Sequence, residues 1–275
     1  MIAWKKAKWA VLLMLVLAAA VFVIGCSGKS ENAGGKVNIA GSTSVQPLAE
    51  ELAQAFEEGN SKIKVDVAGG GSSAGVKAAQ DKTANIGTSS RELKEEEKAS
   101  GLVETLIAKD GIAVIVSTKN QINDLTLEQI KKIYTGEIRN WKEIGGKDAR
   151  ITVVNRDEAS GTRGAFQEIV LGNEGKFVSD AVIQSTTGAV RTTVAQDENA
   201  IGYISLGSLD TSIKAVKVEG VNASEANVLN GSYKISRPFL FLTKGAPDTA
   251  AQTFIDFVLS TEGQEIVAEE FIPVK

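Results

Sequence analysis

Residues 151–171 read ITVVNRDEASGTRGAFQEIVL: an apolar run, a loop of small and hydroxyl-bearing residues, and a second apolar segment. The run at 151–155 predicts a strand and the segment at 163–171 predicts a helix, so the loop SGT at 160–162 lies where the helix begins. A helix begins with backbone N–H groups that have no partner inside the helix, and its dipole is positive there. The segment therefore predicts a strand–loop–helix unit suited to binding an anion.

The same construction occurs twice earlier in the chain. The loop GSTS at 41–44 precedes a predicted helix at 45–58, and the loop GGGSSAG at 69–75 follows a predicted strand at 63–67. Hydroxyl groups add donors, and glycine lets the backbone approach a ligand closely. Serine, threonine and glycine are also ordinary caps and turn formers, so each loop alone has a structural explanation. Three such loops, one of them beside Arg156, favour an oxyanion site.

Strand and helix patterns alternate along the chain, which predicts an α/β fold. The predicted strands are 37–40, 63–67, 111–116, 151–155, 200–204, 214–218 and 239–243. The predicted helices are 45–58, a stretch near 76–80, 126–134, 163–171, and 249–271 with an interruption near Gly263. With four prolines in all, no proline-rich linker marks a boundary. Two lobes that share a hinge and one large domain both fit this pattern.

The N-terminal segment indicates export. Three lysines at 5, 6 and 8 precede an uncharged apolar run at 10–24, which is shorter than the roughly 20 residues that span a bilayer but typical of a secretory signal. The run leads through Gly25 into Cys26, and this resembles the lipobox of bacterial lipoproteins. The resemblance implies a signal peptide at 1–25, a lipid anchor on Cys26 and a flexible linker at 26–36. The alternative is an incidental thiol at the end of an uncleaved anchor helix.

Composition excludes several classes of site. The chain has no histidine and one cysteine, so Ser-His and Cys-His catalysis and histidine or multi-cysteine metal sites are absent. We expect no metal and no cofactor. The formal net charge is −4, and it becomes −7 once the three lysines of the signal are removed. A nucleic-acid partner is not expected because such proteins carry a basic surplus.

Two alternatives use the same loops. Gly69, Gly71 and Ala74 match G-x-G-x-x-A, with Glu92 where a ribose contact would lie, but a dinucleotide site leaves the other two loops unexplained. Asp157 and Glu158 offer carboxylates, yet adjacent residues diverge and hydrolysis needs a positioned base. We therefore expect a binding protein and not an enzyme. An extracytoplasmic phosphoester hydrolase and a surface adhesin or sensor partner are the alternatives.

The chain resembles the phosphate-binding lipoproteins of bacterial phosphate ABC transporters, which have the type II periplasmic-binding-protein fold. The matching stretches are AGSTSVQPLAEELA at 40–53, GGGSSAGVKAA at 69–79, IGTSSREL at 86–93, LTLEQIKKIYTGEIRNW at 125–141, NRDEASGTRGAF at 155–166, TTGAVRTTVAQDENAIGYISLG at 186–207 and FIDFVLSTEGQEIV at 254–267. They cover nearly all of the chain after the signal. The resemblance implies a two-lobed α/β protein with a ligand cleft between the lobes.

The resemblance also implies a domain layout and a function. Lobe I would comprise 37–110 and 221–275 and lobe II 111–220, with crossings near Asp110 and Gly220. A monomer anchored outside the cell membrane would close its lobes around inorganic phosphate, without catalysis, and deliver it to a membrane permease. Sulfate or molybdate is the alternative ligand.

The family's binding residues carry over by position. They imply a phosphate site made of Ser42, Thr43, Ser44, Ser72, Ser90, Arg156, Ser160, Gly161 and Thr162. Ser90 stands where some members carry an aspartate that accepts the proton of hydrogen phosphate. Neighbouring Arg91 either turns toward the anion or lies exposed on a turn. A matching segment contains Thr186, Thr187 and Arg191, which we do not assign to the ligand.

Overall fold

The computed structural model describes residues 34–172 and 174–274. The predicted signal peptide at 1–25, the predicted anchor Cys26 and the linker up to residue 33 lie outside the described residues. Gly35 and Lys36, which the sequence places in the linker, already belong to the first strand and pair with the second.

The strands form one large mixed sheet and a small one. The large sheet has the order β2-β1-β3-β11-β4-β8-β6-β7, with β9 paired to β4, and β5 pairs with β10. The bounds are β1 (Gly35–Gly41), β2 (Ile63–Gly69), β3 (Ile86–Ser89), β4 (Leu102–Ser117), β5 (Asp124–Leu125), β6 (Thr152–Arg156), β7 (Val182–Gln184), β8 (Ala200–Ser205), β9 (Ile213–Ala215), β10 (Lys217–Val218) and β11 (Ser236–Lys244). The α/β fold predicted from the sequence is confirmed.

Helices follow most of the strands. They are α2 (Gln46–Gly59), α3 (Ser72–Gln80), α4 (Glu95–Lys98), α5 (Leu127–Thr135), α6 (Gly161–Phe166), α7 (Thr187–Gln196), α8 (Glu225–Leu229), α9 (Thr249–Val258) and α10 (Thr261–Val267). Short 3-10 turns lie at Trp141–Ile144 and Leu206–Ser208, and a π turn at Gln167–Leu171 continues α6. The helix predicted at 249–271 is two helices, α9 and α10, and the break lies just before Gly263. There the Ser260 hydroxyl caps α10 by accepting from the Gly263 N–H.

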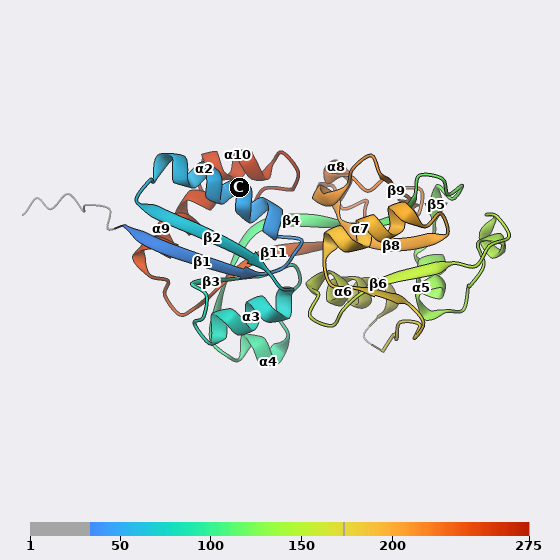
Figure 1. Cartoon of the computed structure of the whole chain (residues 1–275), viewed down its shortest axis with the longest axis horizontal. Helices are drawn as coiled ribbons and strands as arrows, with labels where there is room; N and C mark the ends of the chain where they lie inside the picture. The colour runs from blue at the N-terminus through green and yellow to red at the C-terminus, as the bar shows by residue number, and fades with distance from the viewer. Residues whose placement is uncertain (1–33, 173, 275) are drawn as a thin grey trace, which may run out of the picture. The chain divides into compact units, whose positions relative to one another are not determined.

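Two groups of elements are joined by β4 and β11, as Figure 1 shows. Strand β4 pairs with β11 over its first half and with β8 and β9 over its second half. The first core, packed between β1, α2 and α9, includes Val37, Leu52, Ile107, Phe241 and Phe254. The second core, packed around β8, α5 and α6, includes Ile112, Tyr134, Phe166, Tyr203 and Ile235. The fold is thus two-lobed, and both lobes share the β4–β11 ribbon.

A buried ion pair lies on this ribbon between the two cores. Asp110 and Arg237 are direct cross-strand partners, with 0% and 1% of their side chains exposed. Arg237 donates to Asp110 Oδ2 through Nε at 2.9 Å and Nη2 at 2.8 Å. Asp110 Oδ1 accepts from the Ser205 hydroxyl at 3.0 Å and the Leu206 N–H at 3.1 Å. Because the carboxylate is fully hydrogen-bonded, it fixes the guanidinium at the point where the chain crosses between lobes.

Replacement of Asp110 by asparagine is expected to destabilise the protein by about 3–5 kcal/mol, because it leaves the buried Arg237 charge without a partner. Denaturant unfolding followed by circular dichroism measures this loss. The matched control is Asp66→Asn, which breaks the exposed pair with Lys36 and should change stability little. Equal stabilities of the two variants would contradict the role given to the buried pair.

Candidate functional site

The three glycine and hydroxyl loops of the sequence converge on one place. Each lies at a helix N-terminus, before α2, α3 and α6. The Gly71 N–H donates to the Gly41 carbonyl at 2.8 Å, and the Ser73 N–H donates to the Ala159 carbonyl at 3.0 Å. The second of these bonds joins the loop before α3, in the first lobe, to the loop before α6, in the second. The two lobes are therefore in contact at the glycine and hydroxyl loops before α3 and α6.

Glycine makes this contact possible at two positions. A Cβ on Gly161 would overlap the Ser72 hydroxyl, and a Cβ on Gly71 would lie 2.7 Å from the Ala159 carbonyl oxygen. Gly71 also has a φ of +90°, in the region that favours glycine. Larger residues would hold the loops apart.

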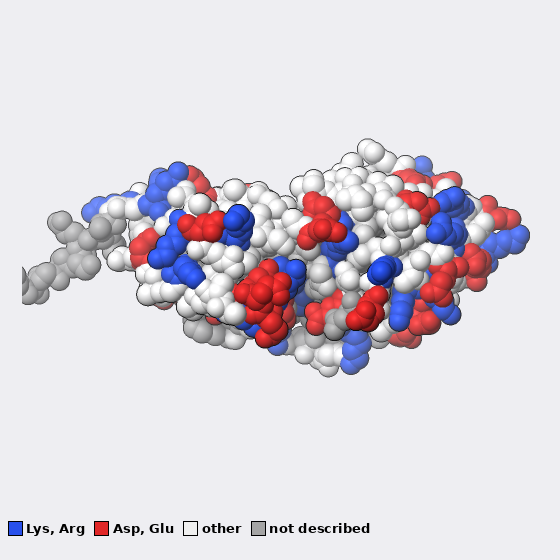
Figure 2. All heavy atoms as spheres, turned by 90° about the horizontal axis from the view of Figure 1, so that it is seen from below, with Lys and Arg blue, Asp and Glu red and all other residues white. Residues whose placement is uncertain are grey.

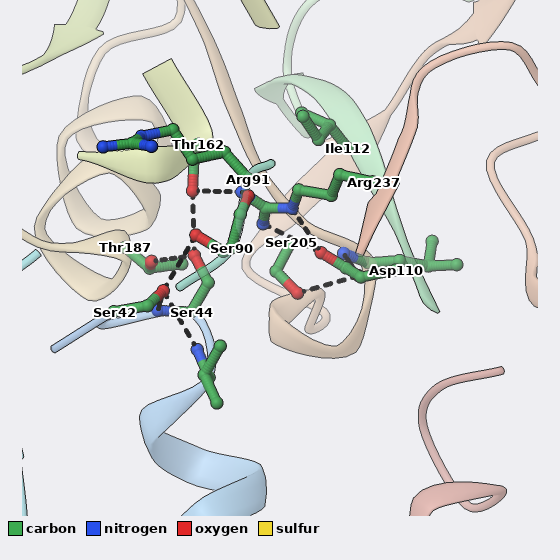
Figure 3. A network of polar contacts seen from close by, with 12 residues as sticks. Ser42, Ser44, Ser90, Arg91, Asp110, Ile112, Thr162, Thr187, Ser205 and Arg237 are labelled. Atoms are coloured by element: carbon green, nitrogen blue, oxygen red, sulfur yellow. Dashed lines mark hydrogen bonds and ion pairs between the residues drawn. The ribbon is translucent and has the colours of Figure 1, made fainter. Parts of the chain in front are cut away.

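Hydroxyl groups from both lobes bind one another here. Ser44 Oγ lies 2.9 Å from Thr162 Oγ1 and 3.0 Å from Thr187 Oγ1. Figure 3 shows the three side chains together in the polar network. Thr43 Oγ1 lies 3.3 Å from the same Thr187 oxygen. Ser44 and Thr162 come from opposite lobes and are almost fully buried. The predicted residues of the α2 and α6 loops thus meet in a single network.

Three predicted serines form a second part of the network. Ser42 Oγ accepts from the N–H groups of Ser44 and Val45, at 3.2 and 3.3 Å, and donates to Ser90 Oγ at 2.8 Å. Ser72 Oγ accepts from the Ser90 N–H at 3.0 Å and lies 3.3 Å from Ser90 Oγ. Because Ser42 Oγ accepts from two N–H groups, its proton points toward Ser90, whereas either hydroxyl can be the donor between Ser72 and Ser90.

Arg156 ends strand β6 and carries the charge of the site. Its Nε donates to the Gln184 carbonyl at 3.2 Å, and its Nη2 donates to the Ser185 carbonyl at 3.0 Å and to Thr43 Oγ1 at 3.2 Å. Its Nη1 donates to Thr187 Oγ1 at 3.4 Å. The residue is 2% exposed, and no carboxylate forms an ion pair with it in the described parts of the chain. Burial lowers the pKa of Arg156, but a guanidinium stays protonated.

A buried cation without a carboxylate at ion-pair distance is costly, and the neutral carbonyl and hydroxyl acceptors around Arg156 compensate it only in part. An anion bound beside Arg156 would supply the missing negative charge. The arrangement can therefore hold an oxyanion by one guanidinium and a ring of hydroxyls, with tetrahedral oxygens meeting the planar donors of the arginine.

Two predicted residues stand at the edge of the network. Ser160 caps α6, and its Oγ accepts from the Arg163 N–H at 3.2 Å, so this side chain is engaged with its own helix. Gly161 forms the close contact with Ser72 described above. Both present the first turn of α6 to the network through their backbone.

Arg91 points away from the hydroxyl network and is not exposed, so neither of the two arrangements considered from the sequence occurs. Its guanidinium forms two bonds to the Glu97 carboxylate, of 2.7 and 2.8 Å, and one of 2.9 Å to the Glu92 carbonyl. Burial alone would raise the pKa of Glu97, but the hydrogen bonds from Arg91 and from the Lys94 N–H lower it below its ordinary value. Arg91 is thus a structural residue of the turn before α4.

Two residues outside the predicted set belong to the network. Thr187, at the start of α7, contacts Thr43, Ser44 and Arg156. Arg237 donates to Thr162 Oγ1 at 2.5 Å and to the Ser90 carbonyl at 3.2 Å. The sequence feature that points to Arg237 is a positive charge inside the apolar run ISRPFLFLT at 235–243. A negative charge, Asp110, lies in the same way inside the apolar run IAKDGIAVIV at 107–116. Opposite charges inside two apolar strands indicate a buried pair.

Over residues 34–172 and 174–274, no three acidic, histidine or cysteine side chains are placed to hold a metal ion. In the same ranges, every helix is too short or too polar to cross a membrane.

Comparison with known sequences relates the chain to one family. A profile of the PBP superfamily domain matches residues 27–262. The phosphate-binding protein PstS of Bacillus subtilis is 33% identical over 98% of this chain and 95% of its own length. The phosphate-binding protein PstS of Borreliella burgdorferi is 34% identical over 87% of this chain and 90% of its own length.

Solved structures give the same result. An X-ray structure with bound phosphate, of a Clostridium perfringens protein described as a phosphate ABC transporter substrate-binding protein, has a TM-score of 0.86 and 50% identity. It covers 87% of this chain and 100% of its own. An ABC-type phosphate transport receptor from Vibrio cholerae has a TM-score of 0.72 and 33% identity, with the same coverage.

Replacement of Glu97 by glutamine is expected to lower the free energy of unfolding at neutral pH by about 1–2 kcal/mol, because charge-assisted hydrogen bonds to Arg91 become neutral ones. A lowered carboxyl pKa gives stability that is present above the unfolded-state pKa and lost as pH falls through the folded-state value. Urea unfolding at neutral and at acidic pH should therefore show the difference shrinking in acid. The control is Glu95→Gln, which removes an exposed carboxylate of the same helix. A difference that stays constant over the acid range would contradict the ion pair.

Proposed function

This chain belongs to the PBP superfamily and to the family of the PstS phosphate-binding proteins, and on that footing we propose that it captures inorganic phosphate for import by an ABC transporter. The observation that carries the proposal is Arg156, a buried and unpaired guanidinium among hydroxyl groups from both lobes. Hydroxyls that bind one another at 2.8 to 3.3 Å in this structure would donate the same protons to a bound anion.

Capture works by lobe closure about the β4–β11 ribbon, the hinge motion of two-lobed receptors. We propose the first crossing at Asp110, two residues before Ile112, where β4 begins to pair with β8. For the second crossing we propose Ser236 in place of the neighbourhood of Gly220, because Val228, Tyr233 and Ile235 pack in the second core. Lobe II then extends to residue 235, and the final segment of lobe I begins with β11.

The choice of anion is made without a carboxylate at residue 90. Ser90 Oγ accepts one proton from Ser42 and retains a lone pair that can accept the proton of hydrogen phosphate. Among the described residues, the carboxylate that hydrogen bonds connect to Ser90 is Asp110. The connection runs through Arg237, which binds Asp110 and the Ser90 carbonyl. Rejection of sulfate therefore rests on one hydroxyl acceptor and lacks the repulsion that a carboxylate would add. Sulfate and molybdate are the alternative ligands that the binding experiment tests.

The relatives are binding proteins, and we propose that this chain too is not an enzyme. The chain has no histidine, and the groups in direct contact with Arg156 are hydroxyls and carbonyls, which are poor general bases. Absence of turnover with a phosphoester substrate supports the proposal, and release of phosphate would favour the hydrolase alternative.

The proposal includes an extracytoplasmic location, with a lipid on Cys26 as the anchor and a membrane permease as the partner to which a monomer delivers phosphate. Support comes from the apolar segment and lipobox-like residues that end at Cys26. The eight residues 27–34 between Cys26 and the first strand would span up to about 26–29 Å when extended, which would leave the lobes room to move above the membrane.

The purified domain that starts at Ser27 should bind phosphate in calorimetry after exhaustive dialysis. Arg156→Ala should weaken binding at least a hundredfold, because a charge-assisted fork is lost, and Thr162→Val about ten- to a hundredfold. Arg139→Ala is the control, since that arginine is exposed. Saturation by sulfate or molybdate without a response to phosphate would refute the ligand, and phosphate binding unchanged in both site variants would refute the site.

Cys26→Ser should abolish membrane anchoring. In cells given a labelled fatty acid, the unmodified protein should carry the label and enter the detergent phase of a phase separation, whereas the variant should remain aqueous. An unmodified protein that is itself unlabelled and aqueous would show that Cys26 is not a lipid anchor.

A further inference from the structure

We infer that Arg237 is a positioning residue for anion capture: it orients the Thr162 hydroxyl so that this group donates its proton to the bound anion. The inference rests on the proposed function. It adds to the site a residue that lies on the ribbon between the lobes, outside all three loops.

The guanidinium of Arg237 has two ends with separate partners. Nε and Nη2 both donate to Asp110 Oδ2, at 2.9 and 2.8 Å. This leaves Nη1, which donates to Thr162 Oγ1 at 2.5 Å and to the Ser90 carbonyl at 3.2 Å. Figure 3 shows the side chain reaching from Asp110 on one side to Thr162 on the other. Asp110 thus aims one nitrogen at two predicted ligand residues from opposite lobes.

The direction of the Thr162 proton follows from this contact. A guanidinium cannot accept a hydrogen bond, so Thr162 Oγ1 must be the acceptor toward Arg237. The single hydroxyl proton is then available on the other side, where Ser44 Oγ lies at 2.9 Å. An anion that enters the network meets a hydroxyl already turned toward it, and no rotamer search is needed on binding.

Charge separates the roles of the two buried arginines. Arg237 and Asp110 form a neutral pair, whereas Arg156 has no carboxylate partner among the described residues. Arg156 therefore supplies the attraction for the anion, and Arg237 supplies orientation. The Nη1 contacts also require the lobes to be close, because Ser90 follows β3 and Thr162 lies in α6.

A double-mutant cycle tests the inference. Arg237→Lys keeps a cation for Asp110, but a lysine has one compact ammonium and cannot span both ends of the fork. We expect Arg237→Lys to weaken phosphate binding about tenfold or more in calorimetry. In the Thr162→Val background, where no hydroxyl remains to be oriented, the same replacement should change affinity less than about threefold.

The matched control replaces Thr43, which contacts Arg156 and Thr187 but not Arg237. Arg237→Lys should weaken phosphate binding by the same factor in the Thr43→Val background as it does in the otherwise unmodified protein. A residue that only stabilises the hinge would weaken binding by the same factor in all three backgrounds, and that result would overturn the inference. Thermal unfolding without phosphate confirms that each variant is folded.

The charge-neutral variant Asp110→Asn/Arg237→Met gives a second measurement, because it removes both charges of the buried pair and leaves neither without its partner. This double replacement should weaken phosphate binding when Thr162 is present and change it little when Thr162 is replaced by valine. An equal loss of affinity in both backgrounds would count against the inference. The outcomes separate the two proposals: no phosphate binding by the unmodified protein refutes the function, and phosphate binding with a fully additive cycle refutes only the role of Arg237.

Discussion

A positive charge buried without a counter-ion is the constraint around which the site is built. Desolvation of a guanidinium costs several kcal/mol, and Arg156 recovers this only in part through carbonyl and hydroxyl acceptors. The fold contains a second buried arginine, Arg237, and there the cost is met by Asp110. The contrast is informative because the two guanidinium groups serve one network. In the proposed site, Asp110 neutralises Arg237, whereas Arg156 has no carboxylate at ion-pair distance among the described residues and is left to attract the anion.

This local charge explains how an acidic chain can bind an anion. On the face in Figure 2, acidic and basic side chains are interspersed. The surface also carries exposed ion pairs, such as Lys36 with Asp66 and Lys142 with Asp148. Charges beyond about 8–10 Å are screened in physiological salt, whereas a buried charge is screened far less. The surface therefore contributes little to anion affinity, and the donors in contact with the anion determine it.

Local patterns predicted the strands and helices that carry the loops, because helix spacing and glycine–hydroxyl turns are encoded over short stretches. Apolar residues three or four apart, from Val45 through Leu48 and Leu52 to Phe56, are typical of a helix, and the last three are buried in α2. Strand β3 and helix α7 were missed: the four residues of β3 are all buried and show no alternation, and α7 is rich in threonine and has a weak apolar face. Arg237 was missed for a different reason, since its role depends on cross-strand pairing with Asp110, which only the folded sheet establishes.

The hydroxyl network links recognition to closure. Ser44 and Thr162 come from different lobes, and Gly161 allows the Ser72 hydroxyl to approach the first turn of α6. Serine and threonine hydroxyls are suited to this contact because each can donate or accept, so they satisfy one another when the loops meet and can all turn their protons toward an anion. A carboxylate in the ring would accept only and would repel a fully ionised oxyanion, but it would also neutralise Arg156. With Ser90 in that position, the proposed site adds no carboxylate to offset the charge of Arg156, so attraction for the anion would be retained while selectivity would depend on the Ser90 hydroxyl as an acceptor.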